Sequence, residues 1–171
     1  MFDRSTFWPP MPDWTQARIA APGIEISATH CDRAVFLFGG ATEAISALAA
    51  PHLGLDGALL WIAADRALLV GALGTELDEG WHASGVAVSA LQDAQVRIDI
   101  KGAAAAALLR RGSLSLALGR ESAGAALAFA GVTVLFEQLD VGARLHVDLP
   151  QAAHVWHWLL AATFGKTEDY P

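Results

Sequence analysis

The sequence predicts an α+β fold, in which an antiparallel or mixed sheet packs against helices. Residues 94–118, AQVRIDIKGAAAAALLRRGSLSLAL, place apolar side chains at every second position, then a run of helix-forming residues, then alternation again. Alternation with a period of two is typical of a strand that buries one face, and alanine and leucine favour helix. The same alternation returns at 143–149, directly before a helix that opens with Pro150.

The segment 94–118 contains the clearest of these signals. Val96, Ile98 and Ile100 alternate with polar residues, which predicts a strand that ends before Gly102. A helix is expected from 103 to 111, because two arginines and then Gly112 follow its alanines and leucines. Residues 114–118 are expected to form a further strand.

The segments on either side predict shorter elements. Before the central segment we expect a strand at 35–38, a helix from the N-cap Thr42 to Pro51, a hairpin of 58–63 and 67–71 around the loop 64–66, an exposed helical turn at 75–82 and a strand at 84–91. After it we expect strands at 127–129, 132–137 and 143–149, a turn at 140–142 and the final helix from Pro150.

The expected organisation is one α+β domain, residues 22–165, with an arm at 1–21 and a tail at 166–171. Residues 7–14 of the arm hold three of the seven prolines and two of the six tryptophans. Proline fixes the backbone and removes an amide donor, so this stretch is expected to run extended. Two interpretations remain open: its aromatic rings fold back onto the domain's own core, or they fill pockets on another subunit.

The second interpretation gives a set of candidate subunit-interface residues. They are the aromatic and proline side chains of the arm together with two tryptophans of the final helix: Phe7, Trp8, Pro10, Trp14, Trp156 and Trp158.

The composition favours burial against partners. The hydrophobic share is 54% and the charged share only 17%, against about 25% in ordinary soluble domains. No charge-free run is long enough for a spanning helix, which needs about 20 residues, and the first ten residues lack the apolar run of a signal peptide. We therefore expect no membrane segment and a cytoplasmic protein, its large apolar surface covered by other chains.

The charge balance excludes a nucleic-acid partner. The net charge is −7, and the 11 lysines and arginines are scattered without a basic stripe. Cys31 is the only cysteine, so neither an internal disulfide nor a cysteine-based metal site is expected.

No catalytic, cofactor-binding or metal-binding residue is predicted in this chain. Gly39-Gly40 lacks the residues of a phosphate-binding loop, and the acidic group Glu76, Asp78 and Glu79 is explained by a solvated face. A metal could be held by His154 and His157 with His146, but histidines at a helix surface or subunit boundary explain the same spacing. Beside His30, Cys31 is interpreted as a buried thiol.

Residues 58–164 resemble the gamma subunit of heterotetrameric sarcosine oxidase and of related N-methyl amino acid dehydrogenases. The similarity lies in four stretches and their order: ALLWIAADRALLVG, VRIDIKGAAAAALLRRGSLSL, AFAGVTVLFEQL and RLHVDLPQAAHVWHWLLAA. The last two are the most specific, because an aromatic-rich V-W-H-W-L helix directly after a short strand is how that family ends.

The resemblance implies a fold similar to the folate-binding domain of aminomethyltransferases. It also implies an alpha subunit that binds NAD and tetrahydrofolate, a beta subunit that carries FAD and shares FMN with alpha, and a small zinc-binding delta subunit. This chain would then be a non-catalytic structural subunit of a flavin-dependent oxidase or dehydrogenase that demethylates sarcosine or another N-methyl amino acid or amine. The alternative is a stand-alone folate-binding one-carbon-transfer protein of the aminomethyltransferase type.

Overall fold

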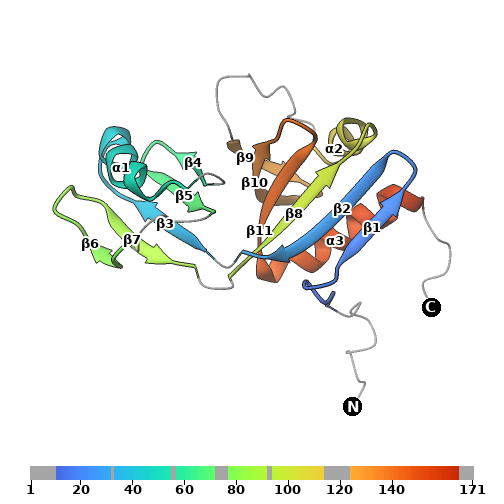
Figure 1. Ribbon diagram of the computed structural model, residues 1–171, viewed down its shortest axis with the longest axis horizontal. Coiled ribbons are helices and arrows are strands. Elements are labelled where there is room, and N and C mark those ends of the chain that lie inside the picture. Colours follow the sequence, from blue (N-terminus) through green and yellow to red (C-terminus); the bar gives the residue numbers. More distant parts are fainter. Residues whose placement is uncertain are drawn as a thin grey trace, which may run out of the picture.

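The computed structural model describes residues 11–31, 33–54, 57–71, 77–91, 94–113 and 124–165. These residues form two antiparallel sheets and three α-helices, so the α+β fold class is confirmed. Figure 1 shows the two sheets side by side.

The larger sheet, called here the large sheet, has six strands. Their order is β1 (Arg18–Ala21), β2 (Ile24–His30), β8 (Gln95–Lys101), β11 (Ala143–Asp148), β10 (Val132–Gln138) and β9 (Gly124–Phe129). The helices α2 (Ala105–Gly112) and α3 (Leu149–Phe164) belong to this half of the molecule (Figure 1).

The small sheet has five strands. Their order is β4 (Ala58–Ala63), β5 (Arg66–Val70), β3 (Ala34–Phe38), β7 (Ala87–Ala90) and β6 (Gly80–Trp81). It carries the helix α1 (Thr42–Ala49) and the short 3₁₀ turn η2 (Ala50–His52). All of these elements lie in sequence between β2 and β8, two strands that are direct neighbours in the large sheet. The small sheet is therefore an insertion into the large one.

The main core lies between the large sheet and its two helices. Val96, Ile98 and Ile100 of β8 are fully buried there, as their alternation predicts. They pack with Val155 and Leu159 of α3, whose apolar positions recur every three to four residues. A separate core lies between α1 and one face of the small sheet.

A third apolar cluster joins the two sheets. Leu60 and Leu68 of the small sheet pack there with Leu135 of β10. At the start of β9, a Cβ on Gly124 would lie 2.6 Å from Leu60 Cδ2 and 2.7 Å from the carbonyl oxygen of Phe136. The absence of a side chain at Gly124 therefore allows β4 and the edge of the large sheet to approach each other.

Most predicted elements are present within a few residues of the expected positions, but three expectations are corrected. The second half of the predicted arm belongs to the fold, because Arg18–Ala21 pairs with β2. Within 75–82, the described residues contain the strand Gly80–Trp81 instead of a helical turn. Thr42 does not cap α1: the cap is Ala41, and the Thr42 hydroxyl donates to the Ala64 carbonyl at 2.9 Å.

Other predictions lie outside the described residues. They are the strand 114–118, the tail 166–171 and the arm residues Phe7, Trp8 and Pro10.

Candidate functional site

Ionisable side chains meet on the face of the large sheet that points away from α3. The apolar residues of β8 and β11 face the core, so the intervening polar residues project to the other side. Strand register places Arg144 of β11 between Asp99 of β8 and Glu137 of β10, and sets His146 directly opposite Arg97. Three neighbouring strands thus bring the cluster together, although its members are far apart in sequence.

The cluster is a connected network of ion pairs and hydrogen bonds. Arg144 Nε donates to Asp99 Oδ1 at 2.7 Å, and Arg144 Nη1 donates to Glu137 Oε2 at 3.3 Å. His146 Nε2 donates to the same Glu137 oxygen at 3.1 Å. At the margin, Arg97 Nε lies 3.8 Å from Asp99 Oδ1. The single guanidinium of Arg144 therefore bridges two carboxylates.

The network keeps its charges paired. Burial raises the pKa of Glu137, but the hydrogen bond from His146 and the charge of Arg144 outweigh burial, so its pKa lies below the usual range. For Arg144, burial lowers the pKa, but the hydrogen bonds and charges of Asp99 and Glu137 raise it by more, so the pKa lies above its ordinary value. The native fold therefore holds Glu137 as a carboxylate beside a permanently charged guanidinium.

His146 is hydrogen-bonded to a carboxylate, as the histidine of a general-base pair is, but its side chain is buried. The residue is 2% exposed, and its Nδ1 has no hydrogen-bond partner among the described residues. Nε2 faces Glu137, and Nδ1 is enclosed by the surrounding described residues. A substrate has no access to this atom in the observed packing. The network is thus suited to fixing the register of β8, β11 and β10.

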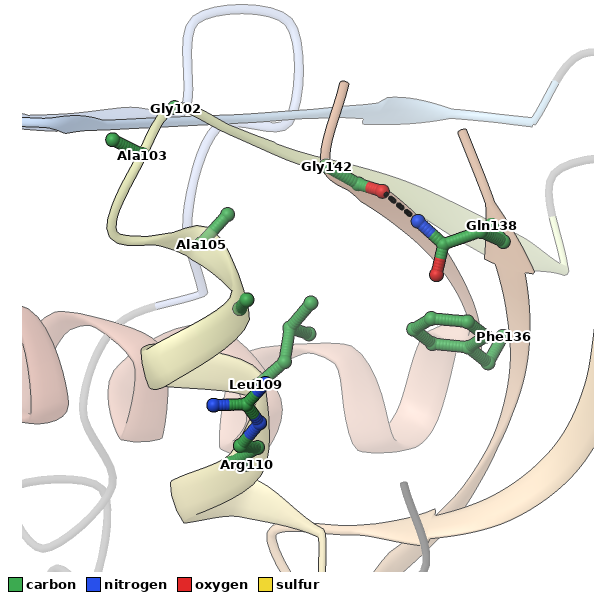
Figure 2. Close-up of a pocket in the computed structure, with 9 residues that line it drawn as sticks. Gly102, Ala103, Ala105, Leu109, Arg110, Phe136, Gln138 and Gly142 are labelled. Carbon is green, nitrogen blue, oxygen red and sulfur yellow. Dashed lines mark hydrogen bonds between the residues drawn. The ribbon is translucent and has the colours of Figure 1, made fainter. Parts of the chain in front are cut away.

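A pocket of about 240 Å³ lies on the other side of the large sheet, between the start of α2 and the ends of β10 and β11 (Figure 2). Gln138 Nε2 closes one side by donating to the Gly142 carbonyl at 2.8 Å. The lining consists mostly of small and apolar residues: Gly102, Ala103, Ala105, Ala106, Leu109, Arg110, Phe136, Gln138 and Gly142. Arg110 is the one charged residue among these nine, so the pocket offers contacts for binding and no acid–base pair.

The three histidines considered as metal ligands have separate partners. His146 contacts Glu137, His154 Nε2 donates to the Ala130 carbonyl at 2.8 Å, and His157 Nδ1 donates to the Ala153 carbonyl at 2.6 Å. Within the described ranges, no group of three His, Cys, Asp or Glu side chains is arranged to hold a metal ion. The structure therefore does not bring these three histidines together.

Two of the predicted interface tryptophans are internal. Trp14 and Trp156 are 3% and 6% exposed, and their rings pack edge to face with centroids 6.1 Å apart. This corrects their assignment to a subunit interface and matches the interpretation in which the arm folds back onto the core. Trp158 is half-buried and packs against Phe129, with ring centroids 5.0 Å apart.

Cys31, Asp78 and Glu79 occupy structural positions, whereas Glu76 lies outside the described residues. Cys31 is buried in the cluster that joins the sheets. Glu79 Oε1 accepts a hydrogen bond from the backbone N–H of Ala90 at 2.8 Å, and the Asp78 carbonyl accepts one from His82. Of the helices in the described part of the chain, none is long and apolar enough to cross a lipid bilayer.

The ion-pair network was not predicted from the sequence. The available signal was that Asp99, Glu137 and Arg144 occupy the polar positions of alternating strands. Such positions are normally solvated, and only the pairing of β8 with β11 and of β11 with β10 shows that these charges meet.

The fold has a counterpart of known structure. A chain of the heterotetrameric sarcosine oxidase from Corynebacterium sp. U-96, solved in complex with pyrrole 2-carboxylate, superposes with a TM-score of 0.65 and 20% sequence identity. The match covers 90% of this chain and 91% of the other, so the two chains share their fold over nearly their whole length. No protein-family model and no curated protein matches this sequence.

Proposed function

We propose that this chain is a gamma-like structural subunit of a heteromeric flavin-dependent oxidase or dehydrogenase. The observation that carries the proposal is the shared fold, over 90% of this chain, with a chain of a heterotetrameric sarcosine oxidase. The substrate of the complex would be sarcosine or another N-methyl amino acid or amine, demethylated by oxidation on the partner subunits.

The surface of this chain supports a role in assembly. Large apolar side chains remain exposed in several places, among them Trp81, Phe164 and Leu53. The helix α3 contains no charged residue in its 16 positions, although its outer positions are accessible. Surfaces of this kind are typical of subunit contacts.

The proposal assigns the cofactors to the partners. FAD, FMN, NAD, tetrahydrofolate and zinc would be bound by the alpha, beta and delta subunits. The arm residues Phe7, Trp8 and Pro10, together with the half-buried Trp158, would contact those partners.

The test is purification of the tagged chain from cells that contain its natural partners. Stoichiometric recovery of larger subunits, identified by mass spectrometry and carrying a flavin absorption spectrum, would support the proposal. Recovery of the chain alone, well folded and without flavin, would refute it.

The folate-binding alternative is separated by a direct titration. A structural subunit binds no tetrahydrofolate by itself, so calorimetry on the purified chain should show no heat of binding. Saturable 1:1 binding would favour the stand-alone one-carbon-transfer protein instead.

A further inference from the structure

The small sheet has an aromatic face that is covered at one end only. In the strand register, Phe38 of β3 and Trp81 of β6 are both paired with Ala87 of β7, so these three side chains project from the same face of the sheet. Phe36 projects from this face as well, because it precedes Phe38 by two residues in β3. The opposite face, with Leu37 and Val88, packs beneath α1. We call Phe36, Phe38 and Trp81 the aromatic patch.

The patch becomes more exposed with distance from the large sheet. Phe36 packs against the cluster that joins the sheets, and its ring lies 5.6 Å from that of Phe38. Phe38 is 39% exposed and Trp81 is 72% exposed. A Cβ on Gly39 would lie 3.6 Å from the Trp81 ring, so the indole extends over Gly39, the residue after Phe38. The indole of Trp81 therefore lies beside the residue that follows Phe38 in sequence.

Acidic side chains border the aromatic patch. Asp78 and Glu79 directly precede β6, and both are exposed. Asp65 lies at the other side, where its carbonyl accepts a hydrogen bond from Gly39 N–H at 2.9 Å. Arg66, which lies opposite Phe38 on β5, is paired with Asp65 at 3.5 Å. The border thus keeps a net negative charge.

We propose that the aromatic patch is the anchor by which this chain docks onto the flavoprotein part of its complex. The occupant is a partner surface with an apolar pocket flanked by lysine or arginine side chains. Trp and Phe are the residue types that dominate binding energy when a partner buries them, and opposite charge at the rim directs the encounter. A second copy of this chain is a poorer occupant, because face-to-face docking would bring the acidic borders together. This inference rests on the proposed function.

The experiment compares capture of the flavoprotein by full-length tagged variants in cells containing the natural partners. Trp81→Ala is expected to lower the recovered flavin-bearing subunits by at least about tenfold. Val141→Ala is the matched control, because Val141 is 66% exposed in a turn of the large sheet and should leave recovery unchanged. Asp78→Lys is expected to lower recovery at low ionic strength and to have less effect at high ionic strength. Thermal unfolding of each variant verifies that the fold is retained.

The outcomes separate the inference from the proposed function. If wild type and Trp81→Ala recover equal amounts of flavoprotein, the patch is not the anchor, while the structural-subunit role stands. If wild type recovers no flavoprotein, both are wrong. If Trp81→Ala converts a homodimer to a monomer while flavoprotein recovery is unchanged, a second copy occupies the patch and the inference is overturned.

Discussion

Trp14 and Trp156 meet edge to face at 90°, so an aromatic residue that precedes the first strand is fixed to the helix α3. Trp14 also belongs to the same apolar core as Ile19 of β1 and Val155 of α3. Residues before the first strand therefore contribute to the packing of the large sheet.

Replacing Trp14 by alanine is expected to destabilise the fold strongly. The substitution leaves a large cavity against Trp156, and removal of a buried aromatic side chain costs about 3–5 kcal/mol. Urea unfolding followed by circular dichroism measures the change in unfolding free energy.

Two variants control this experiment. Trp14→Phe should cost less, because the ring is kept and the buried indole N–H, which has no hydrogen-bond partner among the described residues, is removed. Trp81→Ala should change stability by less than about 0.5 kcal/mol, because Trp81 is exposed. Equal stability of Trp14→Ala and wild type would contradict the observed packing.

The Glu137 network predicts a pH-dependent stability. Because the pKa of Glu137 is lowered in the fold, its stabilising effect is complete above its ordinary pKa of 4.5 and is lost as the pH falls through the lower native value. Glu137→Gln should therefore be less stable than wild type by about 2 kcal/mol at neutral pH. The difference should shrink in acid, and urea titrations from pH 7 down to about pH 3 measure it.

The control for this prediction is Asp140→Asn, which removes an exposed carboxylate from the turn between β10 and β11. It should follow the wild-type pH profile. A stability gap between Glu137→Gln and wild type that is constant across the whole pH range would disprove the electrostatic explanation.

The contact between the two sheets predicts that Gly124 tolerates no side chain. In Gly124→Ala the new methyl group meets Leu60, which can move, and the Phe136 carbonyl, which is held in β10. Overpacking of this kind costs about 1–3 kcal/mol. Thermal unfolding should show a lower midpoint for Gly124→Ala, whereas Ala128→Ser, at an exposed position of the same strand, should unfold like wild type.

The apolar surface predicts poor behaviour of the chain in isolation. Expressed alone, it should aggregate as its concentration rises, and co-expression with the proposed flavoprotein partners should yield a defined complex. Size-exclusion chromatography distinguishes the two. A monodisperse monomer at high concentration would speak against dependence on partners.

Local patterns were sufficient to predict most of the elements. The alternation of Val96, Ile98 and Ile100 identified β8 because one face of that strand is uniformly buried. The hairpin of β4 and β5 was identified because its turn, Ala64-Asp65, interrupts two apolar runs. In contrast, Gly80–Trp81 is a strand only because β7 pairs with it, and the acidic residues before it favoured a helical turn.

Pairing between distant segments was not predictable from local patterns. The division into two sheets depends on β2 pairing with β8 across the inserted strands, a choice that alternation does not specify. The same limit applies to Asp99 and Glu137. A polar residue in an alternating strand gives the same sequence pattern whether its side chain contacts water or Arg144. The burial of Trp14 was one of two interpretations that the sequence left open.

The insertion of the small sheet between β2 and β8 has a consequence for the order of events on the ribosome. Its five strands come from one continuous stretch, residues 34–90, and can pair as soon as that stretch has emerged. In contrast, β2 cannot pair with β8 until β8 has been synthesised, and β8 cannot pair with β11 until β11 has been synthesised. During synthesis, the small sheet should therefore form while the large sheet is still incomplete, and the apolar strands of the large sheet need protection until β11 has emerged.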